Sequence, residues 1–346
     1  PRRWIKLANP WLSDFLDSYL GNSWITKLDE LENLEKFEND PVALQAFMEV
    51  KKEAKEALAE YIQDHEGITI DVDSILDCQV KRIHEYKRQL MNALRILYIY
   101  SQLKKGNLPN FYKTTFIIGG KAASSYATAK RIIALIKDIQ KMVNNDSDVN
   151  DKMQVVFLTN FNVSYAERVY AGANFSEQIS TAGTEASGTS NMKFMMNGAP
   201  TIGTMDGANI EIAEEAGSKN NYIFGATVEE FKRISSIYDH RRFLDAHREL
   251  EELITFLEGH GNLSGRYDDL AYILRHSDNY FVMYDLESYI EATLKANEDY
   301  AMEQRTGDLS FYTQKSFRNT AHSGKFSSDR TIQEYAEDIW YIERVN

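Results

Sequence analysis

Short apolar runs alternate with helical segments along the middle of this chain. The runs span residues 75–80, 114–118, 155–158, 200–204 and 222–224. Most of them are followed by a segment with apolar residues at every third or fourth position, as in helices. Because a strand followed by a helix usually pairs in parallel with the next strand, the pattern predicts an α/β fold: a Rossmann-like, doubly wound, mainly parallel sheet flanked by helices. Such sheets bind ligands at the carboxyl ends of their strands.

Helix-capping signals extend the prediction to both ends of the chain. Residues 26–29 form a plausible capping box for a short helix. Asp40 and Pro41 then begin a longer helix, which Gly67 ends. Thr227 begins another capped helix. We expect the part of the chain after residue 224 to be mostly helical.

Composition limits the kinds of partner. The chain has 346 residues, 43% of them hydrophobic, which suits two domains or one large α/β domain. A net charge of −13 disfavours a nucleic acid or an anionic membrane as the partner. No apolar run is long enough to span a membrane, and the first residues lack the apolar core of a signal peptide. Cys78 is the single cysteine, so we expect no disulfide framework, no cysteine metal cluster and a cytoplasmic location.

The stretch from residue 177 to residue 211 has the features of a ligand-binding loop. Three glycines mark turns, and two hydroxyl residues can cap the helix that begins near residue 191: Gly183, Gly188, Gly198, Thr189 and Ser190. The N–H groups and the dipole at a helix start attract anions, so we expect a phosphate at residues 188–190. Lys193 lies one turn inside, where burial would lower its pKa and make its amine nucleophilic. A tight connection with a solvated lysine is the simpler alternative.

A second stretch places positive charge at the end of an expected strand. Five potentially basic residues lie within eight positions of this acidic chain: Lys81, Arg82, His84, Lys87 and Arg88. Arginine grips phosphate through two parallel hydrogen bonds, and lysine adds a compact charge. Because the stretch follows the run at 75–80, these groups are expected at the ligand-binding edge, with a solvated face as the alternative. We interpret His84 as structural.

Several strings in the chain resemble those of one enzyme family. Residues 185–198 read EASGTSNMKFMMNG, residues 201–211 read TIGTMDGANIE, and residues 80–90 read VKRIHEYKRQL. Together with PRRW at residues 1–4, they closely resemble the glycogen (α-glucan) phosphorylases, and the resemblance covers essentially the whole chain. It implies one half of a two-lobed glycosyltransferase of the GT-B type.

The resemblance implies pyridoxal 5′-phosphate as the cofactor, and it assigns roles to particular residues. Lys193 would carry the cofactor as a Schiff base, and the catalytic residues would be Lys193, Arg82 and Lys87. Further cofactor-binding residues would be Lys81, Gly188, Thr189, Ser190 and Trp4. The substrates would contact Arg82, Lys87, Glu185, Ala186, Ser187 and Gly188. No metal ion is implied.

Two positions depart from the family pattern. Ser190 stands where many members have glycine, but its backbone N–H can still bind a phosphate. Phe161 stands where the family typically has tyrosine, which removes one hydroxyl near the cofactor.

The resemblance further implies the cofactor-carrying, carboxyl-terminal domain of an α-glucan phosphorylase. Its reaction would be the reversible transfer of a terminal α-1,4-linked glucosyl unit of glycogen or maltodextrin to inorganic phosphate, giving glucose 1-phosphate. We expect a fragment, because the chain does not begin with methionine and nothing in it resembles the family's amino-terminal domain. The isolated chain should be inactive, since half a cleft neither aligns the reactants nor excludes water. The full-length enzyme should be a homodimer.

The same resemblance suggests a division of the chain. Residues 1–327 would form the catalytic domain, and residues 328–346 would form a terminal helix that crosses to the amino-terminal domain in the family. An apolar stripe along residues 329–340 then predicts that this helix packs differently on its own domain or on a second copy of the chain.

Two other classes of function stay open. A nucleotide-sugar glycosyltransferase shares the two-lobed fold but needs no lysine-bound aldehyde. A non-catalytic module would bind pyridoxal phosphate or polysaccharide without turnover. If borohydride reduction leaves no cofactor on the chain, the first class is favoured. If adding the missing domain as a separate chain does not restore activity, the second class is favoured.

Overall fold

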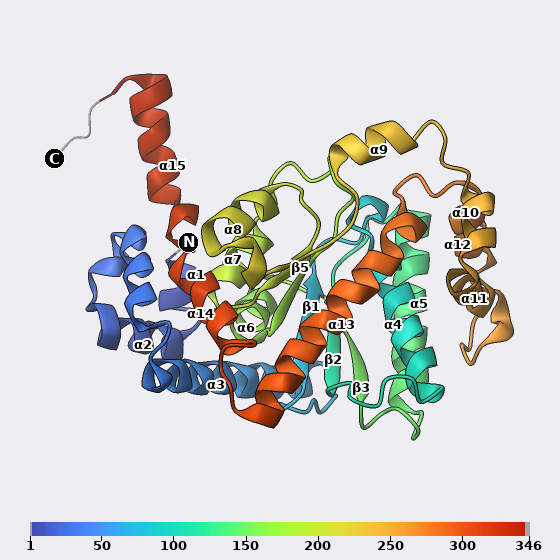
Figure 1. The fold of residues 1–346 in the computed structure, drawn as a ribbon, viewed down its shortest axis with the longest axis horizontal. Coiled ribbons are helices and arrows are strands. Elements are labelled where there is room, and N and C mark those ends of the chain that lie inside the picture. The colour runs from blue at the N-terminus through green and yellow to red at the C-terminus, as the bar shows by residue number, and fades with distance from the viewer. Residues whose placement is uncertain (1, 343–346) are drawn as a thin grey trace.

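A single sheet of six parallel strands organises the fold (Figure 1). The computed structural model describes residues 2–342. The strands are β1 (Ile75–Val80), β2 (Thr114–Gly119), β3 (Met153–Leu158), β4 (Phe175–Gln178), β5 (Thr201–Gly203) and β6 (Tyr222–Ile223). Their order across the sheet is β3-β2-β1-β4-β5-β6. This arrangement confirms the predicted doubly wound α/β fold.

Helices flank the sheet and fill the carboxyl-terminal part of the chain. Those before β4 are α1 (Arg3–Lys6), α2 (Pro10–Leu20), α3 (Pro41–Glu66), α4 (Gln89–Lys104), α5 (Ala127–Asn144) and α6 (Val163–Gly172). Those between β4 and residue 260 are α7 (Ser190–Met196), α8 (Ala208–Ala216), α9 (Val228–Ile234), α10 (His240–Ala246) and α11 (Arg248–Thr255). The last are α12 (Asp268–His276), α13 (Val282–Thr306), α14 (Thr313–Ala321) and α15 (Ser328–Glu334). No helix within residues 2–342 is both long enough and apolar enough to cross a membrane.

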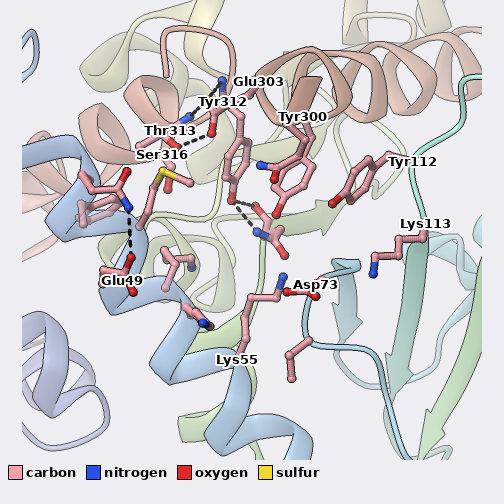
Figure 2. Close-up of a pocket in the computed structure, with 18 residues that line it drawn as sticks. Glu49, Lys55, Asp73, Tyr112, Lys113, Tyr300, Glu303, Tyr312, Thr313 and Ser316 are labelled. Atoms are coloured by element: carbon pink, nitrogen blue, oxygen red, sulfur yellow. Dashed lines mark hydrogen bonds between the residues drawn. The ribbon is translucent and has the colours of Figure 1, made fainter. Parts of the chain in front are cut away.

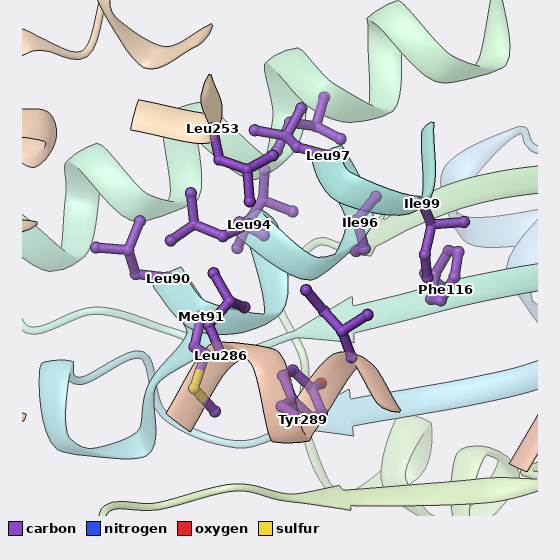
Figure 3. Packing of buried hydrophobic residues seen from close by; sticks show 14 of the residues in the cluster. Leu90, Met91, Leu94, Ile96, Leu97, Ile99, Phe116, Leu253, Leu286 and Tyr289 are labelled. Atoms are coloured by element: carbon purple, nitrogen blue, oxygen red, sulfur yellow. The ribbon is translucent and has the colours of Figure 1, made fainter. Parts of the chain in front are cut away.

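One face of the sheet packs against α4, α5 and α13. Leu94 and Leu97 of α4, Phe116 of β2 and Leu286 of α13 belong to one buried cluster (Figure 3). Leu253 of α11 joins the same cluster, so α11 is held against the outer side of this layer. The apolar positions of these helices are buried because they form the core of the molecule on this side.

The other face of the sheet packs against α3, α6 and α7. Leu58 of α3, Val169 of α6 and Phe194 of α7 form a second cluster with Leu76 and Val156 of the strands. Because helices cover both faces, every residue of β1 and β2 is buried. Burial on both faces fits the mainly apolar composition of these strands, although β1 also buries the polar side chains of Asp77 and Gln79.

The strand order reverses between β1 and β4. The chain runs from β1 to β2 and β3, and it then returns to place β4 on the opposite side of β1. Loops that leave the carboxyl ends of two such strands run to opposite sides, and this is where α/β sheets bind ligands. Residues 81–88 and 179–189 therefore form the edge at which a site is expected.

Several predicted helix ends are confirmed, and one is wrong. Asp40 caps α3 through the N–H of Val42, and Gly67 ends that helix in the left-handed conformation. Thr227 forms the predicted capping box at the start of α9. Residues 26–29 do not form a capping box, because the segment Leu28–Phe37 is a 3₁₀ helix without a side-chain cap.

Two elements, β4 and α8, were not predicted from the sequence. Strand β4 has no apolar run, because three of its four residues are the buried polar side chains Ser176, Glu177 and Gln178. Helix α8 has no side-chain cap at its start. Helix α4 begins at Gln89, directly after Arg88, which adopts a left-handed conformation.

The terminal helical segment projects away from the body of the molecule (Figure 1). It comprises α15 and a following helical turn, Tyr335–Trp340. Ile332, Ile339 and Trp340 are each more than half exposed. The prediction that this stripe packs on its own domain is therefore wrong, while packing on a second copy stays a prediction. Residues 343–346 of this predicted segment lie outside the described residues.

Candidate active site

Lys193 occupies the position one turn inside α7 that the sequence predicts. Its amine lies 4.4 Å from the ring centroid of Trp4 and 5.8 Å from that of Tyr170. The surrounding rings partly bury the amine, and burial lowers the pKa of Lys193. Trp4 thus lies beside Lys193 although the two residues are distant in sequence, and a larger fraction of the amine is in the neutral, nucleophilic form than in a solvated lysine.

The loop before α7 presents unpaired N–H groups. All three glycines that mark the predicted turns, including Gly188 in this loop, have positive φ angles. Among the described residues, the backbone N–H groups of Gly188, Thr189 and Ser190 have no acceptor. The predicted side-chain cap is absent, because Thr189 makes no capping bond and the Ser190 hydroxyl accepts from Gln178 instead. The helix start therefore keeps donors available for an anion.

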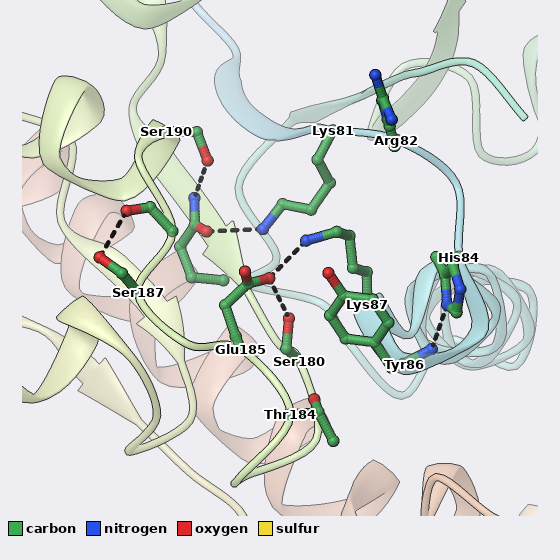
Figure 4. Close-up of polar contacts among 12 residues, drawn as sticks. Lys81, Arg82, His84, Tyr86, Lys87, Ser180, Thr184, Glu185, Ser187 and Ser190 are labelled. Atoms are coloured by element: carbon green, nitrogen blue, oxygen red, sulfur yellow. Dashed lines mark hydrogen bonds and ion pairs between the residues drawn. The ribbon is translucent and has the colours of Figure 1, made fainter.

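Lys81 is connected to this loop through Gln178. Its amine donates to Oε1 of Gln178 at 2.6 Å, and Nε2 of Gln178 donates to the Ser190 hydroxyl at 3.3 Å (Figure 4). Burial lowers the pKa of Lys81 to about 7. Sequence reasoning missed Gln178, since it ends a strand that has no apolar run.

Lys87 is held by Glu185 of the opposite loop. The two side chains form an ion pair of 2.5 Å, and the Ser180 hydroxyl donates to the same carboxylate oxygen at 3.4 Å (Figure 4). Burial disfavours the charged form of Lys87, but hydrogen bonds to Glu185 and Tyr86 outweigh burial and raise its pKa. Lys87 therefore remains a cation, and in this structure its ion-pair partner is Glu185.

The structure does not bring every predicted residue into this cluster. Arg82 is exposed, and Figure 4 shows its guanidinium pointing away from Lys81 and Lys87. Ala186 and Ser187 lie exposed on the loop. Lys81 and Lys87 therefore point towards the loop before α7, whereas Arg82 does not. His84 packs against Tyr86 and Tyr126, which fits a structural role.

A turn after β5 holds the loop in place. The Asp206 carboxylate accepts the N–H groups of Thr184 at 3.2 Å and Glu185 at 2.9 Å. Gly207 packs so closely that a Cβ there would lie 2.6 Å from the Ser187 carbonyl oxygen, and its φ is +52°. A side chain at residue 207 would displace the loop that carries Glu185.

Arg88 fixes the base of the same region. Its guanidinium is fully buried, forms an ion pair of 2.7 Å with Asp285 of α13, and donates to the Ile179 carbonyl at 2.7 Å. Arg88 follows Lys87 directly, and Ile179 follows Gln178 directly. The arginine therefore anchors both sides of the site, a role that its place in a basic stretch did not reveal.

Comparisons with known proteins place this arrangement in a family. The family model "Carbohydrate phosphorylase" matches residues 1–342. The chain is 45% identical over its full length to glycogen phosphorylase of Synechocystis. It is 44% identical, over 99% of its length, to the human muscle form of glycogen phosphorylase and to the glycogen phosphorylase of Chlamydia pneumoniae. It spans about 40% of the length of these curated relatives.

Proposed function

The chain belongs to the carbohydrate phosphorylase family, and from that premise we propose that it is the cofactor-carrying part of an α-glucan phosphorylase. The proposed reaction is the reversible phosphorolysis of terminal α-1,4-glucosyl units of glycogen or maltodextrin to glucose 1-phosphate. Relatives named glycogen phosphorylase support this proposal, because the similarity extends over the whole chain. The chain spans about 40% of their length, which supports the proposal that the activity needs further parts of the protein.

Pyridoxal 5′-phosphate fits the residues at this edge of the sheet. Lys193 would hold the aldehyde covalently through its amine, with Trp4 beside it. The unpaired N–H groups of residues 188–190 and the amine of Lys81 would hold the phosphate. When bound, the cofactor would supply a phosphate group that takes part in proton transfer. Its electronic role as a carbanion sink, usual in other enzymes, is not needed here.

The chain's own residues would bring two phosphate groups together. Two like-charged groups repel each other strongly in a partly desolvated site, and only nearby positive charge offsets that repulsion. Lys81 would serve the cofactor phosphate, and Lys87 and Arg82 the substrate phosphate. Arg82 would have to rotate inward from its exposed position. Glu185 would have to release Lys87, and residues 185–188 would then contact the substrates.

The remaining parts of the proposal concern the complete enzyme. The amino-terminal domain would supply the glucan-binding half of the cleft, and residues 1–327 would be the catalytic domain that faces it. Residues 328–346 would cross to that domain. The complete enzyme would be a cytoplasmic homodimer of the two-lobed GT-B type, and this chain alone would not turn over glucan.

The observation that carries this proposal is the partly buried Lys193 amine directly after a helix start with unpaired donors. The test is incubation with pyridoxal 5′-phosphate, borohydride reduction and mass spectrometry of the peptides. We expect one modified peptide containing Lys193, and complete loss of the reducible absorbance in Lys193→Ala.

Lys130 provides a matched control. Like Lys193, it is the fourth residue of its helix, but it is exposed on α5. Lys130→Ala should bind cofactor as the wild type does. A reducible adduct that persists in Lys193→Ala would contradict the proposal, as would modification spread over exposed lysines in the wild type.

A further inference from the structure

A cavity of about 380 Å³ lies at the amino edge of the sheet, opposite the candidate active site. The segments that precede β1, β2 and β4 contribute Asp73, Lys113 and Asn174 to its lining. The other walls come from α3, α13 and the start of α14. None of the residues assigned above to the cofactor or substrates lines it. Its size suits a small organic molecule.

Most charged groups around the cavity are already satisfied by the protein. Lys51 donates to three backbone carbonyl oxygens, at 2.6, 2.9 and 3.2 Å. Lys113 forms an ion pair of 2.5 Å with Asp71. The Glu303 carboxylate accepts two backbone N–H groups and the hydroxyl of Thr313. These groups shape the walls but leave little capacity for a ligand.

Lys55 is different, because it is buried and only partly satisfied. The side chain comes from α3 and is 4% exposed. Its amine donates to the Ser74 carbonyl at 2.6 Å, and the described residues offer it no other acceptor. An ammonium group has three donors, so two of them lack a partner within the described protein. A buried cation in this state is stabilised by an anion that enters the cavity.

Three tyrosines form the wall that faces Lys55. The ring centroids of Tyr112 and Tyr300 are 5.1 Å apart, and those of Tyr300 and Tyr312 are 4.9 Å apart. Figure 2 shows these rings in a row on one side of the cavity, with Lys55, Asp73 and Lys113 on the other. A row of aromatic rings packs well against another flat ring.

We propose that this cavity binds a small aromatic carboxylate, whose carboxylate pairs with Lys55 and whose ring packs against Tyr300. Lys52, an exposed lysine on α3 that also lines the cavity, adds a second positive charge at the rim. A neutral ring would gain only the aromatic contact. A carboxylate without a ring would gain only the charge. The combination gives the site its specificity.

The charge state of Lys55 provides a signature for this site. Burial lowers the pKa of Lys55 to about 8, against the opposing influence of Asp73 and Asp71. Lys113 and the buried Cys78 also influence the pKa of Lys55. Lys51 lies one helical turn before Lys55 on α3. A bound carboxylate favours the ammonium form, so binding takes up a proton above pH 8. Affinity should therefore fall as pH rises from 8 to 10.

The experiment measures benzoate binding to the purified protein by isothermal titration calorimetry between pH 6.5 and 10. Benzoate stays ionised throughout this range, so its own titration does not contribute. We expect saturable binding that weakens by up to about tenfold per pH unit above pH 8. Benzamide, the neutral analogue, should bind at least tenfold more weakly at pH 7. Equal binding of the two compounds, or benzoate binding independent of pH, would overturn the proposal.

Two variants locate the binding. Lys55→Met should weaken benzoate binding at least tenfold, and Tyr300→Leu should weaken it several-fold without changing its pH dependence. If Lys55→Met does not fold, Tyr300→Leu and the wild-type pH profile still decide the question. Lys87→Gln is the matched control, because it removes a lysine from the candidate active site. A loss of benzoate binding in Lys87→Gln, with Tyr300→Leu unaffected, would place benzoate at the carboxyl edge and refute the cavity site without touching the proposed phosphorylase function.

Discussion

The two edges of the sheet both hold partly or fully buried lysine amines, but their hydrogen-bond acceptors differ. At the carboxyl edge, Lys81 donates to the side chain of Gln178, and Lys87 to the carboxylate of Glu185. At the amino edge, Lys51 donates to three backbone carbonyl oxygens. Side-chain acceptors can rotate and release an amine when a ligand arrives, whereas backbone carbonyls at the ends of packed elements cannot.

This difference separates two roles that the pKa values do not separate. Burial lowers the pKa of both Lys51 and Lys81 to about 7. A perturbed pKa often marks a functional site, but structural networks perturb pKa values as well. The number and the nature of the acceptors therefore decide the interpretation: three backbone carbonyls use all the donors of Lys51, whereas Lys55 has a single acceptor. We therefore interpret Lys51 as a structural residue and predict that Lys81 can exchange its Gln178 contact for an anion.

The largest expected effect is on the free energy of unfolding when each of these two lysines is replaced by methionine. Lys51→Met leaves three buried carbonyl oxygens without their donor, and each such loss destabilises by about 1 kcal/mol or more, so we expect unfolding to become easier by about 3 kcal/mol. Lys81→Met should destabilise by less than about 1 kcal/mol, because the Gln178 amide can turn towards water. Urea denaturation followed by circular dichroism measures both values.

Sulfate binding by the same two variants provides a second test of this comparison. The folded fraction of Lys51→Met should still bind sulfate, whereas Lys81→Met should bind it weakly. Equal destabilisation by the two substitutions would show that the type of acceptor does not distinguish the two edges.

A smaller effect concerns the pH dependence of anion binding at the carboxyl edge. The pKa of Lys81 lies at about 7 in the unliganded protein, and an anion beside it raises that pKa, so binding takes up a proton as pH rises above 7. Sulfate affinity should therefore fall between pH 7 and pH 9, by up to about tenfold per unit. Sulfate itself does not titrate in this range. Calorimetry at a series of pH values measures the trend.

Lys81→Arg is the control for this prediction. Arginine keeps its charge at every pH tested, so the variant should bind sulfate with little pH dependence. A pH profile that is the same in the wild type and in Lys81→Arg would mean that another group controls binding.

Much of the fold could be predicted because local sequence and tertiary burial agree. Strands β1, β2 and β3 read as apolar runs, since both of their faces are covered. Strand β4 does not, because its Glu177 is buried against Arg95 of α4 at 2.5 Å and accepts the Tyr289 hydroxyl at 2.8 Å. Those partners are far away in the sequence. A strand made of polar residues cannot be recognised until the groups that satisfy them are known.

In the candidate site, too, some features could be predicted from local sequence and others could not. The place of Lys193 inside α7 and the turns around it follow from local signals, and the structure confirms them. The contacts of Lys81 and Lys87 depend on where the end of β4 and the loop after it lie, and no local signal specifies that. Sequence spacing also grouped Arg82 with these lysines, although the backbone turns its side chain outward. The functional roles of all these residues stay predictions.

The smallest effect tests whether the acceptor at the carboxyl edge is displaceable. Glu185 pairs with Lys87, and an entering anion must compete with that carboxylate. Both side chains are partly solvated, so the competition is worth about 0.5–1 kcal/mol. Glu185→Gln should therefore tighten sulfate binding about threefold, as measured by calorimetry at pH 7. Glu252→Gln is the matched control, because it removes the same charge from an exposed ion pair with Lys105. If the control tightens binding equally, the gain reflects net charge alone. If Glu185→Gln weakens binding, the carboxylate positions Lys87 and does not compete with the ligand.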